Sequence, residues 1–192
     1  MNVYDFDETL YAGESCVDFA LFFIKKDPSV LRHLPDVFIT FAKYKRQKIT
    51  FDYFINNYGK MFKDYFATHD VDLKKIMPEF WTEKRLKNKL RPFYKSLHRE
   101  DDVVISASPV FLICPACERL GIKHIIGTGF DTETGEIGKP CFRESKIDRF
   151  YEYCGEGAVI DDFYTDSMND QFLMTLAKRV FLVKGEKITQ IK

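Results

Sequence analysis

The sequence predicts an α/β protein, in which a Rossmann-like parallel sheet carries helices on both faces and an all-helical cap is inserted after the first strand. A short strand at residues 1–6 opens the chain, and β-branched runs alternate with helical segments from residue 102 onward. Residues 16–91 interrupt this alternation with apolar residues at helical spacing and no obvious strand. We therefore expect a core of residues 1–15 and 92–192 and a cap of residues 16–91.

The cap segment contains signals that begin and end helices. Asp27 and Pro28 end a first helical run, and Thr50 can cap a later helix that is rich in aromatic residues. Either Asp70 or Asp72 can cap the next helix. The phenylalanines of such helices most often form the core of the cap itself, although a lipid or another apolar substrate could also contact them.

The second half of the chain alternates strands and helices. Residues 127–140 hold four glycines and are expected to form a loop with a hairpin. The predicted strands are residues 102–106, 124–126, 158–164 and 180–183, and the predicted helices are residues 109–120, 144–153 and 168–177.

Composition excludes several classes of protein. The 192 residues include 29 Lys and Arg and 29 Asp and Glu, so the formal net charge is zero and bulk electrostatic binding of nucleic acid is not expected. No segment approaches the roughly 20 apolar residues of a membrane helix, and the acidic N-terminus lacks a signal-peptide pattern. We expect a cytoplasmic protein without a nucleic-acid partner or a transmembrane segment.

The cysteines do not indicate a disulfide framework, because five is an odd number and no secretion signal accompanies them. Cys114 and Cys117 have the spacing of a redox pair or of half a zinc site. A second pair at similar spacing is missing, so we interpret both as structural thiols near a helix start.

Polar side chains follow the predicted strands at the edge where open parallel sheets bind ligands. Several acids at one edge repel one another unless a cation joins them, and a set of oxygen ligands favours Mg²⁺. Ser108, which precedes Pro109, is interpreted as a helix cap. The other residues at this edge are Asp5, Asp7, Ser106, Lys146, Asp161, Asp162, Asp166 and Asp170.

Four segments in this order resemble the motifs of phosphatases of the haloacid dehalogenase superfamily. The first is Asp5-Phe-Asp-Glu-Thr-Leu10, and the second is residues 103–109, which contain Ser106. The third ends at Lys146, and the fourth is Asp166-Ser-Met-Asn-Asp170. The resemblance covers essentially the whole chain. The helical block lies where the subgroup similar to phosphoserine phosphatase (subfamily IB) carries its cap.

The resemblance implies catalytic roles for residues of the first three motifs. Asp5 would attack phosphorus and form an aspartyl-phosphate. Asp7 would protonate the leaving alcohol and then deprotonate the incoming water. Ser106 and the following amide, at Ala107, would bind a phosphoryl oxygen, and Lys146 would offset the charge of the phosphate and of Asp5.

The resemblance also implies a Mg²⁺ site. The carboxylates of Asp5 and Asp166 and the backbone carbonyl of Asp7 would bind the ion, with Asp170 contributing through water. Asp161 and Asp162 are an alternative for the fourth motif, because they too follow an apolar run and some relatives use an adjacent acid pair there.

Substrate contacts are less sharply indicated. Thr9 would support the loop that carries Asp7, and Asn169 would face the phosphate. Glu14 aligns with a glutamate near the amino-acid end of the phosphoserine phosphatase site. The partner is expected to be a small phosphorylated metabolite. A lipid head-group ester is also possible, because the segment at Ser106 is similar to the phosphatidylglycerophosphatase branch.

An acid at Asp7 favours phosphatase chemistry, because dehalogenases of this superfamily lack that acid and cation-pumping ATPases carry a threonine there. The predicted function is Mg²⁺-dependent hydrolysis of a phosphate monoester. The alternatives are a phosphotransferase and a catalytically silent protein that binds a phospho-ligand on the same scaffold.

Overall fold

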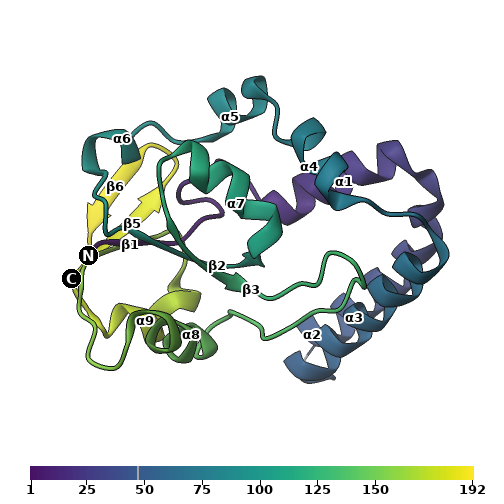
Figure 1. Ribbon diagram of the computed structural model, residues 1–192. Coiled ribbons are helices and arrows are strands. Elements are labelled where there is room, and N and C mark those ends of the chain that lie inside the picture. The colour runs from purple at the N-terminus through teal and green to yellow at the C-terminus, as the bar shows by residue number, and fades with distance from the viewer. Residues whose placement is uncertain (47) are drawn as a thin grey trace.

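The computed structural model describes residues 1–46 and 48–192 and contains one mostly parallel sheet (Figure 1). The strand order is β3-β2-β1-β4-β5-β6, and only β6 is antiparallel to its neighbour β5. This arrangement confirms the predicted α/β class. The strands are β1 (Val3–Tyr4), β2 (Val103–Pro109), β3 (His124–Thr128), β4 (Ile160–Thr165), β5 (Ala177–Lys184) and β6 (Lys187–Gln190).

Helices cover both faces of the sheet, α7 on one side and α8 and α9 on the other (Figure 1). Successive residues of β1 point to opposite faces, as the pleat requires. Tyr4 belongs to the apolar cluster that contains Leu112 of α7, whereas Val3 belongs to the cluster that contains Phe150 of α8. These helices are α7 (Val110–Arg119), α8 (Ser145–Cys154), η2 (Met168–Asp170) and α9 (Gln171–Met174).

Between β1 and β2 the described chain is helical. Thr50 caps α3 by accepting a hydrogen bond from the Tyr53 amide, and Asp72 caps α4 by accepting one from the Lys75 amide. Asp72 is therefore the capping residue of the predicted pair. The helices are α1 (Ser15–Lys26), η1 (Pro28–His33), α2 (Leu34–Lys45), α3 (Phe51–Thr68), α4 (Leu73–Phe80), α5 (Glu83–Lys89) and α6 (Tyr94–Leu97).

Two elements near the C-terminus differ from the sequence-based expectation. The helix expected over residues 168–177 is shorter, because Ala177 pairs with Ile160 and already belongs to β5. The strand β6 was not expected. It forms because the turn at Gly185, where φ is +62°, returns the chain along β5.

The two segments that connect the sheet to the helical block run side by side. The Ala12 amide donates to the carbonyl of Lys89 at 2.7 Å, and the Arg91 amide donates to the carbonyl of Leu10 at 2.8 Å. Tyr11 and Leu90 form an antiparallel bridge between these bonds. The helical block therefore leaves and re-enters the core through one hydrogen-bonded pair of segments.

A hairpin from the core reaches the helical block at a second place. The segment between β3 and α8 extends toward α3 in Figure 1, and the ring of Phe130 lies 5.8 Å from that of Phe62 and 5.9 Å from that of Phe66. Gly135 has a φ of +72°, and a Cβ there would lie 3.0 Å from the carbonyl oxygen of Phe62. Only glycine allows the hairpin to approach α3 so closely.

Candidate active site

Asp5 directly follows β1 and is 8% exposed. Its amide donates to the carbonyl of Tyr164 at 2.8 Å, which continues the pairing of β1 with β4. Lys146, the second residue of α8, places Nζ 3.0 Å from Asp5 Oδ1 and 2.7 Å from Asp170 Oδ1. The fold thus brings together three of the predicted residues, although they are far apart in the sequence.

The charges of this trio depend on one another. Burial raises the pKa of Asp5 to about 7, Lys146 opposes the rise, and Asp170 adds to it. Burial disfavours the Lys146 ammonium, but Asp5 and Asp170 outweigh it and raise the pKa of Lys146 above its ordinary value. Lys146 is therefore a cation shared between two carboxylates, which leaves the trio with a surplus of negative charge.

Asp7 is held at both carboxylate oxygens. The Ser15 amide, at the start of α1, donates to Oδ1 at 2.6 Å, and Ser108 Oγ donates to Oδ2 at 2.5 Å. Burial raises the pKa of Asp7, whereas these hydrogen bonds from Ser108 and Ser15 lower it. The interpretation of Ser108 as a helix cap is wrong, because Pro109 is the N-cap of α7 and the Ser108 hydroxyl binds Asp7 instead.

Ser106 lies at the end of the sheet where Asp5 leaves β1. Tyr4 pairs with Val104, so Ser106 stands two residues beyond the last pair of that ladder. Ser106 is 1% exposed, and its Oγ accepts a hydrogen bond from the Ser108 amide at 3.1 Å. Ala107 follows directly and is exposed at this edge.

The fourth motif follows β4. Asp170 is buried, and its second oxygen, Oδ2, accepts from Thr165 Oγ1 at 2.9 Å. Asp166 is half-buried, and burial raises the pKa of its carboxyl group, with Lys184 opposing the rise and Asp170 adding to it. Lys184 Nζ donates to the backbone carbonyl of Asp166 at 2.6 Å. Asn169 is exposed beside them.

The alternative acid pair is engaged at the opposite end of β4, where the strand begins. Asp161 lies 2.8 Å from the amino group of Met1 and 2.8 Å from Lys178 Nζ. Asp162 accepts from Arg179 at 2.6 Å. Because both acids already have cationic partners at the other end of the strand, the geometry favours Asp166 and Asp170 for the fourth motif.

Thr9 and Glu14 flank Asp7 along the chain. Thr9 Oγ1 is fully buried and has no hydrogen-bond partner within the described part of the chain. Burial raises the pKa of Glu14, and the neighbouring carboxylates of Asp7 and Asp166 raise it further. Glu14 therefore lies among other acidic side chains near Asp7.

Four residues that complete this geometry were not assigned such roles from the sequence. Ser15 and Ser108 bind Asp7, and Thr165 binds Asp170. Arg91 donates to Glu8 at 3.1 Å, and Glu8 has a left-handed backbone with a φ of +54°. The position of Ser108, two residues after Ser106, could have indicated from the sequence that Ser108 lies near the site. The contact of Arg91 with Glu8 could not have been found in this way, because it depends on how the two connecting segments pair.

The donor atoms fit a magnesium ion. Among residues 1–46 and 48–192, no three His, Cys, Asp or Glu side chains form a cluster that could hold a metal. The expected site uses the carboxylates of Asp5 and Asp166 and the carbonyl of Asp7, with Asp170 contributing through water. All of these ligands are oxygen atoms, which hard divalent ions prefer. In the trio of Asp5, Lys146 and Asp170, one cation faces two carboxylates, so an additional positive charge would be favourable there.

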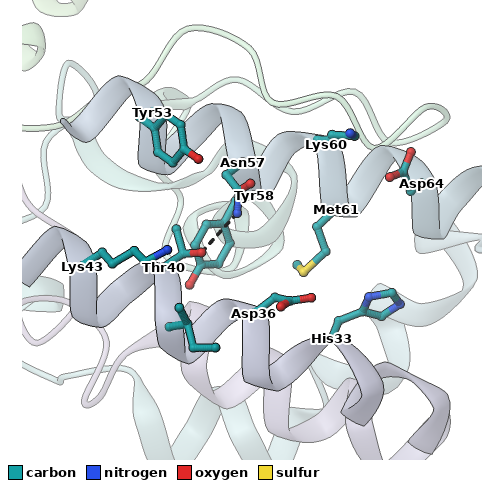
Figure 2. A pocket seen from close by; sticks show the side chains of 11 residues that line it. His33, Asp36, Thr40, Lys43, Tyr53, Asn57, Tyr58, Lys60, Met61 and Asp64 are labelled. Carbon is teal, nitrogen blue, oxygen red and sulfur yellow. Dashed lines mark hydrogen bonds between the residues drawn. The ribbon is translucent and has the colours of Figure 1, made fainter. Parts of the chain in front are cut away.

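A hollow of about 330 Å³ lies elsewhere, between α2 and α3 (Figure 2). Asn57 donates to Thr40 across it, and charged residues of both signs surround them, including Lys43, Lys60 and Asp64. None of the predicted site residues belongs to its described lining. This lining selects no class of ligand, so we place the candidate active site at the sheet edge.

Comparisons with known proteins identify the family. The model of the haloacid dehalogenase-like hydrolase family matches residues 3–175, so the chain belongs to this family of hydrolases. This match confirms the resemblance to the haloacid dehalogenase superfamily. No helix of the described residues is both long and apolar enough to cross a membrane.

Individual relatives differ in how much they cover. A histidinol-phosphatase from Neisseria meningitidis serogroup C (strain 8013) is 34% identical over 99 residues, or 45% of each chain, so the chain matches less than half of that relative. The crystal structure of a protein of unknown function from Bordetella pertussis Tohama I has a TM-score of 0.75 and 24% identity, covering 94% of this chain and 87% of that one. A haloacid dehalogenase family hydrolase from Salmonella enterica serovar Typhi has a TM-score of 0.54 and 10% identity, with coverages of 92% and 59%. The two solved structures share the fold.

Proposed function

We propose that this protein is a Mg²⁺-dependent phosphatase, which hydrolyses a phosphate monoester through an aspartyl-phosphate on Asp5. The observation that carries the proposal is the buried Asp5 carboxylate, held 3.0 Å from Lys146 Nζ, with the second acid Asp7 two residues further along. Membership of the hydrolase family supports it. The phosphatase name of the partial relative supports it as well.

Each residue has a defined task in the proposed reaction. Asp5 Oδ1 contacts Lys146, so we assign the attack on phosphorus to Oδ2. The new Asp5–phosphorus bond forms while the bond from phosphorus to the ester oxygen breaks, and Asp7 gives that oxygen a proton. Water then attacks phosphorus, releases Asp5 and returns a proton to Asp7. Ser106 and the Ala107 amide bind a phosphoryl oxygen.

Magnesium would offset negative charge in the proposed reaction. Bound by Asp5, Asp166 and the carbonyl of Asp7, the ion supplies positive charge that allows a phosphate dianion to approach these acids. Thr9 Oγ1, which is buried without a partner, is available to support the loop that carries Asp7. Asp170 acts through Lys146, because its oxygens bind Lys146 and Thr165.

The expected substrate is a small phosphorylated metabolite of the cytoplasm. Glu14 lies near the carboxylates of Asp7 and Asp166, which favours a cationic group on the substrate at this point. The name of the histidinol-phosphatase relative agrees with an amine-bearing ester. We assign the contact to the phosphate side to Asn169, which is exposed. A lipid head-group ester belongs in the same substrate screen.

Turnover of an aryl phosphate with and without Mg²⁺ tests the proposal. We expect phosphate release that stops in excess chelator, a phosphorylated intermediate that can be trapped in acid, and loss of both in Asp5→Asn. The matched control is Asp161→Asn, which removes an acid from the far end of β4 and should retain turnover. Activity in excess chelator would contradict the metal requirement. Transfer of phosphate to an alcohol in place of water would support the phosphotransferase alternative. Binding of a phosphate ester without turnover would support the alternative of a catalytically silent protein.

A further inference from the structure

Ser108 connects the candidate phosphate site, the candidate proton donor and the first helix of the cap. Its amide donates to Ser106 Oγ at 3.1 Å, and its hydroxyl donates to Asp7 Oδ2 at 2.5 Å. The same hydroxyl lies 3.1 Å from Ser15 Oγ and 3.3 Å from Cys16 Sγ. Ser108 is 4% exposed, so water competes little for these contacts.

The two oxygens of Asp7 have partners of different chemistry. Oδ1 accepts from the Ser15 backbone amide at 2.6 Å, and this N–H can only donate, so the bond favours Oδ1 as the unprotonated, carbonyl-type oxygen of a protonated Asp7. Oδ2 faces a hydroxyl, which can donate or accept. When Oδ2 carries a proton, it can donate to Ser108 Oγ, whose own hydrogen then turns to Ser15 Oγ.

We propose that Ser108 is a positioning residue for the reaction, whose hydroxyl holds Oδ2 of Asp7 in place as the proton-carrying oxygen. This inference rests on the proposed phosphatase function. Oδ2 gives its proton to the ester oxygen as the bond from that oxygen to phosphorus breaks, and it takes a proton from the water that attacks the phosphorylated Asp5. Ser108 acts through Asp7, because its hydroxyl contacts Oδ2, and the proposal gives Ser108 no contact with the substrate.

Esters with different leaving groups test this role. In Ser108→Ala, we expect kcat for an alkyl phosphate to fall about 10- to 100-fold, a part of the ~10²- to 10⁴-fold that a general acid supplies. p-Nitrophenyl phosphate should be slowed much less, because nitrophenolate leaves without a proton. KM should change little for both esters. Ser108→Thr retains a hydroxyl and should restore most of the alkyl phosphatase activity.

A double-mutant cycle separates this role from a general structural one. If Ser108 acts through Asp7, adding Ser108→Ala to Asp7→Asn should slow the enzyme no further. An equal additional loss in that background would overturn the proposal. The matched control is Cys16→Ala, which removes another contact of the Ser108 hydroxyl and should leave the ratio of alkyl to aryl turnover unchanged.

Crystal structures of wild type and Ser108→Ala test the placement without relying on turnover. We expect Asp7 to adopt at least one other rotamer in the variant, and a single unchanged rotamer would show that the Ser15 amide is sufficient. A wild-type protein that hydrolyses neither ester with Mg²⁺ would refute the proposed function, while this pair of structures would still decide whether Ser108 positions Asp7.

Discussion

At the level of single residues, the site combines acids whose burial costs stability. Asp5 and Asp170 share Lys146, and burial raises the pKa of Asp5 to about 7. The isolated metal-free protein therefore keeps a carboxylate in a place that disfavours its charge. Groups that serve chemistry in this way commonly lower the stability of the fold that carries them.

Asp5→Asn should consequently stabilise the metal-free protein by about 0.5–2 kcal/mol, the range typical of such substitutions. Mg²⁺ should raise the thermal midpoint of wild type but not of the variant, because one ligand of the ion is lost. Thermal unfolding with chelator and with Mg²⁺ measures both effects. Asp161→Asn, which removes an ion-paired acid at the other end of β4, should not stabilise the protein. An equal Mg²⁺ shift in Asp5→Asn would contradict the assignment of Asp5 as a ligand.

Asp7→Asn separates the proposed role of Asp7 from that of Asp5. An amide cannot give the proton that an alkyl leaving group needs, so we expect alkyl phosphates to slow by ~10²- to 10⁴-fold and aryl phosphates by less. Steady-state kinetics with one ester of each kind measure the difference. If both slowed equally, the main role of Asp7 would lie in hydrolysis of the intermediate.

At the level of elements, the hairpin between β3 and α8 joins the sheet to α3. Phe130 packs against Phe62 and Phe66, and Lys63 forms an ion pair with Glu136 at 3.4 Å. The ion pair is exposed and contributes little. The aromatic contacts and the close approach at Gly135 therefore determine how tightly the hairpin holds α3.

Gly135→Ala should weaken this contact. A Cβ would meet the carbonyl of Phe62 at 3.0 Å, and the left-handed backbone adds a strain of about 1–2 kcal/mol. Gly185→Ala provides the control, because its φ is +62° and nothing lies within 4 Å of the added Cβ. Thermal unfolding should show a larger loss for Gly135→Ala, and KM for the substrate should rise only in that variant. Equal losses would show that the hairpin does not depend on this approach.

At the level of the whole molecule, the sheet and part of the predicted cap share one core. Phe80 and Trp81 belong to the same buried cluster as Leu112 of α7, and Trp81 Nε1 donates to the Leu112 carbonyl at 2.7 Å. In contrast, the residues on either side of the segment 30–68 lie close together, because Ser29 Oγ is 3.4 Å from His69 Nε2. The segment that can be removed without opening the core is therefore shorter than residues 16–91.

Two deletions test this view. Removing residues 16–91 should give an aggregating protein, because it uncovers the cluster around Trp81. Replacing residues 30–68 with a short linker keeps α1 and α4 and should give a soluble protein that hydrolyses aryl phosphates slowly and with little selectivity. Size-exclusion chromatography and a substrate screen measure the outcomes. A soluble product of the shorter deletion with unchanged substrate preference would show that α2 and α3 do not select the substrate.

The sequence by itself determined the α/β class, because β-branched runs and helical spacing are local patterns that tertiary contacts did not override. It also predicted that Asp5, Lys146 and Asp170 meet, because Asp5 and Asp170 follow strands at one edge of the sheet and Lys146 begins a helix near the same edge. Only the tertiary structure placed Asp161 and Asp162 at the beginning of β4 and Asp166 and Asp170 beyond its end, because the bounds of β4 depend on its pairing with β5.

Contacts between distant segments were likewise decided by the tertiary structure. Ser108 binds Asp7 across 101 positions of the chain, and Arg91 binds Glu8 across 83. Trp81 joins the core of the sheet although it lies in the predicted cap. Such contacts depend on how β1, β2 and the two connecting segments are placed relative to one another. Local patterns of residue types therefore cannot predict these contacts.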